Sequence, residues 1–88
     1  MKVVKWSIDK ARKLKIERKI SIEKIAIMIE ELDYIGIVDV PSRPNQKMFV
    51  LDYEEYIVCV PFVENEEDIF IKTAYRNRKI NKSLKETT

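Results

Sequence analysis

Alternation and spacing of apolar positions predict a strand followed by two helices in the first third of the chain. Residues 2–6 (Lys-Val-Val-Lys-Trp) are expected to form a short first strand. Ser7 is a good helix N-cap, and apolar positions then recur on one face of a helix over residues 8–19. Ser21 gives a second N-cap before a helix expected to end near Asp33.

The two predicted helices differ in how much apolar surface they carry. On the first, the apolar side chains that share one face are Ile8, Ala11 and Leu14. On the second, a continuous stripe is formed by Ile22, Ile25, Ile29 and Leu32, widened by Ala26, Ile27 and Met28. A stripe with a 3.6-residue period is typical of a helix that faces a core, so the second helix is expected to be the more buried one.

The pattern changes to strands in the second half of the chain. Strand-like stretches occupy residues 35–40, 47–53, 56–63 and 69–75. Turn-forming residues at 41–45 separate the first two stretches, and Glu54-Glu55 marks a hairpin. Pro61 predicts a bulge or a position without a ladder hydrogen bond. A short basic helix is expected at 77–84.

This order of elements predicts a single α+β domain over residues 1–88. We expect two N-terminal helices packed on one face of an antiparallel sheet of four to five strands, with a short C-terminal helix. An apolar fraction of 45% is ample for one core. The chain has no signal-peptide pattern and no apolar run of transmembrane length, which predicts a cytoplasmic protein without a membrane partner.

Charge is unevenly distributed along the chain. Residues 1–24 have nine Lys/Arg and three Asp/Glu, residues 30–70 have two and eleven, and residues 71–88 have six and one. The net charge of +2 therefore conceals two basic ends around an acidic middle. Such asymmetry indicates a polyanionic partner, which the total charge alone does not suggest.

The chain contains no histidine and one cysteine, which restricts the chemistry open to it. Catalysis by a histidine base and zinc chemistry are effectively excluded, and no metal site or cofactor is expected. No glycine-rich phosphate loop is present. Cys59 lies within an apolar strand and is interpreted as a small buried residue. Any enzyme activity must depend on Lys, Arg, Glu, Asp or Tyr.

Cations at both ends of the chain are candidates for binding RNA. Strict alternation along the last strand places Lys72 and Arg76 on one face, about 13 Å apart at the standard strand rise. Tyr75 is the aromatic residue beside them. In the first helix the candidates include Lys10 and Lys13. Lysine and arginine set against phosphates give sequence-independent affinity, although a solvated charged face explains the same pattern.

Three further features each have two interpretations. Glu17 could be a general base, or it could pair with Lys13 on the helix surface, which we favour. Trp6 could stack on a base, but a place in the core is favoured. The acidic segment 64–68 lacks calcium-loop spacing, and it is either a solvated turn or a docking surface for a basic partner.

Several stretches in order resemble the BrnT-type toxins of type II toxin–antitoxin systems, which have a RelE-like ribonuclease fold. The matching stretches are Trp6 with the Lys-rich helix, Glu17-Arg18-Lys19-Ile20-Ser21-Ile22-Glu23, Pro44-Asn45-Gln46-Lys47, Val60-Pro61-Phe62-Val63-Glu64, and Phe70-Ile71-Lys72-Thr73 followed by Arg78-Lys79. Many members of that family have glycine before the Ile-Ser pair, where this chain has Lys19. The resemblance covers nearly the whole chain.

The resemblance implies a metal-independent endoribonuclease that cleaves RNA by attack of the 2′-hydroxyl on the adjacent phosphate. It implies that Lys72 and Arg78 stabilise the charge of the transition state. Glu17 and Arg18 would complete the catalytic group, and Lys10, Lys13, Tyr75, Arg76 and Lys79 would bind RNA, with Arg76 added by strand alternation. The implied partners are RNA, on the ribosome or free, and a cognate antitoxin with a DNA-binding domain, through which DNA is bound indirectly. The alternative function is a non-catalytic RNA-binding or protein-interaction module.

Overall fold

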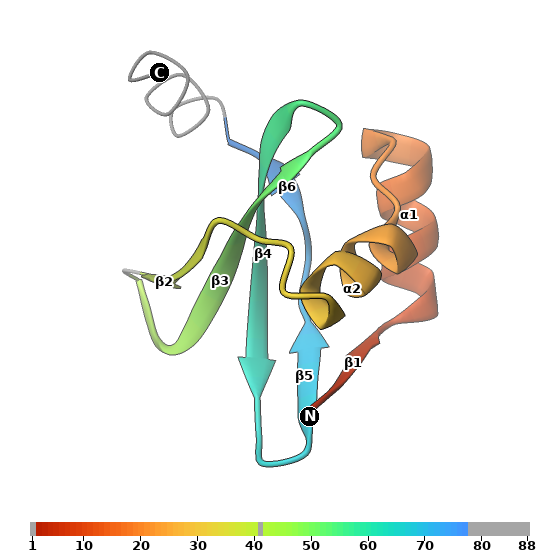
Figure 1. Ribbon diagram of the computed structural model, residues 1–88. Coiled ribbons are helices and arrows are strands. Elements are labelled where there is room, and N and C mark those ends of the chain that lie inside the picture. The colour runs from red at the N-terminus through yellow and green to blue at the C-terminus, as the bar shows by residue number, and fades with distance from the viewer. Residues whose placement is uncertain (1, 41, 78–88) are drawn as a thin grey trace, which may run out of the picture.

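The computed structural model describes residues 2–40 and 42–77, and over these residues the fold is α+β. Two helices cover one face of a six-stranded mixed sheet (Figure 1). The helices are α1 (Ile8–Arg18) and α2 (Ile22–Glu30), and the strands are β1 (Val3–Trp6), β2 (Gly36–Val40), β3 (Arg43–Tyr53), β4 (Tyr56–Glu64), β5 (Asp68–Ile71) and β6 (Tyr75–Arg76).

The order of strands across the sheet is β1-β5-β4-β3-β2, and β6 pairs with β4 beyond the end of β5. Strands β2 to β6 pair in antiparallel fashion, whereas β1 runs parallel to β5. The prediction of an antiparallel sheet of four to five strands is therefore wrong, because the sheet is mixed and the short β6 makes it six-stranded. Alternation identifies a strand but not the direction of its neighbour, and β1 meets β5 across more than sixty positions of sequence.

Both predicted N-caps are confirmed. The Ser7 Oγ accepts a hydrogen bond from the Lys10 amide at 3.3 Å, and the Ser21 Oγ accepts one from the Lys24 amide, also at 3.3 Å. Helix α2 ends at Glu30, earlier than expected, because the chain turns there into a left-handed residue, Leu32.

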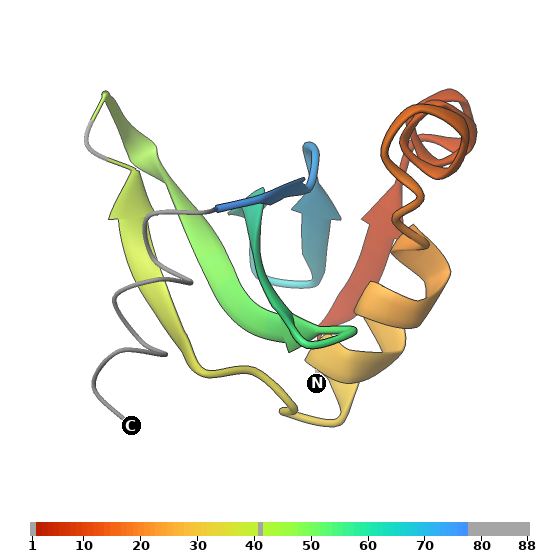
Figure 2. The same ribbon diagram turned by 90° about the horizontal axis from the view of Figure 1, so that it is seen from above.

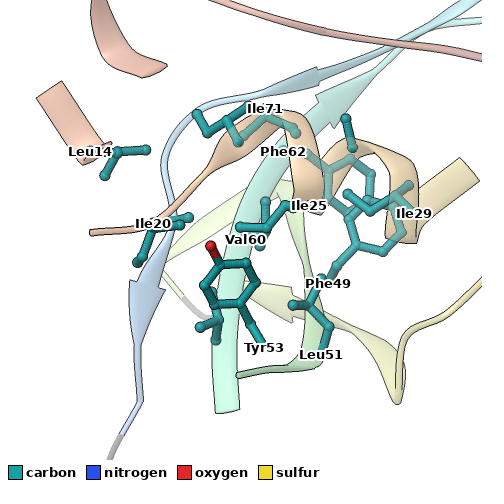
Figure 3. Packing of buried hydrophobic residues seen from close by; sticks show 14 of the residues in the cluster. Leu14, Ile20, Ile25, Ile29, Phe49, Leu51, Tyr53, Val60, Phe62 and Ile71 are labelled. Atoms are coloured by element: carbon teal, nitrogen blue, oxygen red, sulfur yellow. The ribbon is translucent and has the colours of Figure 1, made fainter. Parts of the chain in front are cut away.

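The main core lies between the helices and the sheet (Figure 3). Side chains of α2 point toward odd-numbered residues of β3 and even-numbered residues of β4. The Phe49 and Phe62 rings stack with their centroids 4.2 Å apart. The labelled members of this cluster are Leu14, Ile20, Ile25, Ile29, Phe49, Leu51, Tyr53, Val60, Phe62 and Ile71. Three predicted core positions are wrong, because Ile8 and Leu32 are each 74% exposed and Ile27 is 55% exposed.

A second, smaller cluster lies on the far face of the sheet, away from the helices. It contains Val50, Ile57 and Cys59, with Met48 and Tyr75 packed against it. Cys59 is fully buried, as predicted. Burial raises the pKa of its thiol, while a hydrogen bond from Asn77 acts in the opposite direction. This cysteine is therefore a packing residue.

The predicted strand over residues 69–75 is interrupted, and Pro61 supplies the reason. The Lys72 amide donates to the Pro61 carbonyl at 2.9 Å. In a hydrogen-bonded antiparallel pair the opposite residue donates a second bond back, but Pro61 has no N–H with which to do so. The expected position without a ladder bond is confirmed. Strand β5 consequently ends at Ile71, and β6 begins only at Tyr75.

The interruption also inserts one extra residue. Ile71 lies opposite Phe62, but Tyr75 lies opposite Cys59, so that four steps along one strand match three along the other. Such a bulge reverses the facing of every later side chain. Arg76 lies opposite the core residue Val58 and so faces the helices. The prediction that Arg76 and Lys72 share a face is therefore wrong.

The predicted loop at 41–45 is shorter than expected, because β3 already begins at Arg43. The ladder shifts register between Asp39 and Val40, and this irregularity accommodates Pro44 within the strand. The expected helix at 77–84 lies almost entirely outside the described residues. Within the described part of the chain, no helix is long and apolar enough to cross a membrane.

Candidate functional site

The two basic ends of the chain meet where α1 ends beside β6. The Arg18 Nη1 donates to the Ala74 carbonyl at 2.8 Å, and the Arg76 Nη1 donates to the Arg18 carbonyl at 2.6 Å. These reciprocal bonds join positions 56 and 58 residues apart in sequence. We refer to Arg18, Ala74 and Arg76 as the cationic junction.

The end of α1 makes one half of this junction. Lys19 caps the helix with a left-handed backbone, φ 56°, and Ile20 then enters the core with no exposed surface. The Ile20 amide donates to the Leu14 carbonyl at 3.2 Å, which fixes the turn. The Arg18 carbonyl, left without a partner inside the helix, accepts the guanidinium of Arg76 instead.

The bulge between β5 and β6 makes the other half. It brings Ala74 into the core with no exposed surface and turns Arg76 toward the helices. The Ala74 carbonyl is the functional group that sequence reasoning missed. A backbone acceptor leaves no side-chain signal, and no pattern of residue types could have identified it.

The junction holds two guanidinium groups in fixed positions while leaving them exposed to solvent. Each guanidinium has five N–H donors, and the junction uses only the Nη1 group of each. The remaining donors form planar forks of the kind that bind phosphate oxygens in pairs. The arrangement can bind a phosphodiester without first paying the entropy of ordering these side chains.

Three further predicted residues belong to α1, the helix that ends at the junction. Glu17 and Lys13 are exposed, and Lys10 is half-buried. No ion pair joins Glu17 to Lys13 among the described residues, so the favoured interpretation of a helix-surface pair is wrong. The Glu17 carboxylate is the acidic group adjacent in sequence to Arg18.

Lys72 and Tyr75 belong to the far face of the sheet. The Lys72 ammonium is 5.8 Å from the centre of the Phe70 ring, which points away from the helices because its neighbour Ile71 faces the core. The Tyr75 hydroxyl donates to the Met48 sulfur at 3.6 Å. Burial, and secondarily the nearby Cys59 thiol, raises the pKa of Tyr75, so this phenol is not a base at neutral pH.

The other residues and segments singled out from the sequence lie away from the cationic junction or outside the described residues. Trp6 packs against the main core, which confirms the interpretation favoured over stacking on a base. The acidic segment is an exposed turn in which the Asn65 side chain accepts from the Glu67 and Asp68 amides at 2.9 and 2.7 Å. No group of three or more Cys, Asp and Glu that could hold a metal occurs within residues 2–40 and 42–77. Arg78 and Lys79 lie outside the described residues.

Comparisons of this chain with protein-family models, with curated proteins and with solved structures found no match.

Proposed function

We propose that this protein is the toxin of a type II toxin–antitoxin system, a RelE-like endoribonuclease that cleaves RNA without a metal. The observation that carries the proposal is the cationic junction, where guanidinium groups from the two basic ends are held together. The sequence resemblance places the main transition-state charge on Lys72 and Arg78. The geometry of the described residues favours Arg18 and Arg76 as the group that binds the scissile phosphate.

The chemistry requires a base, a charge stabiliser and an acid. A base removes the proton of the RNA 2′-hydroxyl, and the resulting oxygen attacks the adjacent phosphorus. The bond to the 5′-oxygen breaks, that oxygen gains a proton, and a 2′,3′-cyclic phosphate remains. Arg18 and Arg76 would stabilise the charge on the phosphoryl oxygens, and the Glu17 carboxylate is the proposed base.

The backbone at Lys19 supports the resemblance on which the proposal is built. Lys19 has a left-handed conformation, which favours glycine. Many BrnT-type toxins have glycine at the matching place, before the Ile-Ser pair. The same turn that frees the Arg18 carbonyl for Arg76 is thus a place where this family's usual residue would fit.

The proposal includes a cytoplasmic protein that acts on RNA, free or on the ribosome. It also includes a cognate antitoxin whose DNA-binding domain connects the complex to DNA. Coexpression provides the corresponding test: growth arrest caused by this chain should be relieved by the small protein encoded beside it. Arrest that persists with every adjacent reading frame would contradict this part of the proposal.

The alternative is an RNA-binding module without catalysis. The observation that favours it is the separation of Lys72 from Arg18 and Arg76, since charge on both faces of a sheet suits binding along an RNA backbone. Binding of this kind weakens steeply with salt and leaves the RNA intact.

Incubation of the purified protein with a labelled RNA in EDTA tests the proposal. We expect cleavage products that end in a 2′,3′-cyclic phosphate. Arg18→Ala and Arg76→Ala should each lower the rate about a hundredfold, as loss of a preorganised charge donor does. Arg43→Ala removes an exposed arginine from the β2–β3 hairpin and serves as the matched control. Circular dichroism verifies that each variant is folded.

The outcomes separate the two functions. Cleavage that survives both junction variants but is lost in Lys72→Ala would overturn the assignment to the junction. Salt-dependent RNA binding without any cleavage would favour the binding module. Absence of both binding and cleavage in the folded protein would refute both functions.

A further inference from the structure

An apolar groove lies at the opposite end of the helix-covered face, between the end of α2 and strands β1 to β5. Its volume is about 330 Å³. Phe49 and Phe62 line it together with Val4 and Ile69, and Ile29, Leu32, Tyr34 and Ile37 complete its apolar lining. We refer to the cavity that these residues line as the apolar groove. Its side chains come from α2, the turn after it and five different strands, so the groove exists only in the folded chain.

The groove lies beside an open strand. Among the described strands β2 has a neighbour on one side only, and Figure 2 shows the β2–β3 hairpin extending away from the helices. Ile37 lies opposite Phe49, so its side chain is on the groove side, and it is 46% exposed. The free edge of such a strand presents backbone donors and acceptors that an extended segment can pair with.

Carboxylates outnumber cations around the groove. Glu30 and Lys47 are both in its lining, and Asp39 lies opposite Lys47 on the same face of the sheet. At the other end of the groove Lys2 and Glu64 neutralise each other, with the Nζ and Oε2 atoms 2.8 Å apart. Two more exposed carboxylates, Glu31 and Asp33, flank Leu32 in the turn. The rim therefore favours a positively charged ligand.

Leu32 is unusual among the lining residues. Its backbone is left-handed, φ 60°, a conformation that costs free energy in any residue with a Cβ and favours glycine. Its side chain is also 74% exposed, so it gains little from burial in the free protein. A strained backbone that presents an exposed leucine at the mouth of a groove points to a contact made with another molecule.

We propose that the apolar groove and the edge of β2 bind a partner protein through an extended segment in which apolar residues alternate with lysine or arginine. The segment pairs with β2, places its apolar side chains in the groove, and sets its cations against the acidic rim. A second copy of this chain fits less well. Antiparallel pairing of two β2 strands about Val38 would bring two acidic rims together. The proposal does not depend on ribonuclease activity, because its test measures peptide binding alone.

The test uses two synthetic ten-residue peptides with blocked ends, one alternating isoleucine and valine with lysine, the other with glutamate in place of lysine. Amide chemical shifts of the full chain are followed during titration. We expect the lysine peptide to perturb the amides of Gly36–Val40 and of Leu32, and to bind about tenfold more tightly than the glutamate peptide. The difference should shrink at high salt.

Leu32→Gly separates the proposed contact from folding. Removal of the left-handed leucine should raise the melting temperature of the free protein, while it weakens binding of the lysine peptide about tenfold. Ile37→Ser should weaken binding to a similar degree. Ile16→Ser removes an even more exposed isoleucine from α1 and should leave binding unchanged.

Three results would overturn the proposal. The first is perturbation by the lysine peptide that avoids β2. The second is equal affinity for the two peptides at low salt. The third is sedimentation that shows a dimer dispersed by Ile37→Ser, since the occupant of the groove would then be a second copy.

Discussion

The two ends of the helix-covered sheet face are built on opposite principles. At the cationic junction, polar side chains close onto backbone carbonyls, so that Arg18 and Arg76 are fixed although exposed. At the apolar groove, large side chains such as Leu32 and Ile37 remain exposed with nothing from the described chain covering them. The comparison indicates that one end is complete in the free protein, whereas the other is completed by a ligand.

The largest expected effect comes from Phe62→Ala, which tests the groove end of this comparison. Phe62 is 2% exposed and stacks on Phe49, so its truncation removes both core packing and the groove wall. We expect a loss of about 3–5 kcal/mol in the free energy of unfolding, measured with urea. Phe70→Ala, on the exposed far face, is the control and should cost far less. Equal losses in the two variants would contradict this account of the core.

Ala74→Leu tests the other end with a smaller effect. Ala74 is fully buried and lies between α1 and β6, so a larger side chain there must push the two apart. We expect a loss of about 1–3 kcal/mol from overpacking, together with weaker RNA binding. Binding of the lysine peptide to the groove should not change. Parallel loss of both ligands would show that the two ends are not independent.

The smallest effect concerns the far face, where burial raises the pKa values of Cys59 and Tyr75. Burial favours the neutral, protonated form of each group. The unfolded chain therefore releases these protons at lower pH than the folded chain does. Stability is therefore retained below the ordinary values of 9.0 and 10.0 and falls as pH rises through them. The slope of the free energy of unfolding against pH should therefore be negative in this alkaline range.

Urea titrations between pH 8 and 11 measure this slope. The double variant Cys59→Ala and Tyr75→Phe should flatten it, since neither replacement titrates. A slope unchanged by these substitutions would assign the alkaline loss to other groups.

Local sequence patterns predicted the elements well and their pairing poorly. Ser7 and Ser21 cap helices where their side chains predicted caps, because a cap needs only three neighbouring residues. Buried Cys59 and the Glu54-Glu55 hairpin follow from the same short-range logic. The end of α2 was missed, since a left-handed Leu32 contradicts the usual preference for glycine.

The sequence by itself determined two helices, their core stripe and the strands that receive them, because 3.6-residue and two-residue periods act over a few positions. Only the tertiary structure decided that β1 runs parallel to β5 and that one extra residue opposite Pro61 turns Arg76 toward Arg18. Register and strand direction depend on partners far along the chain, and a shift of one residue exchanges the two faces of a sheet. The candidate site exists because of that single shift.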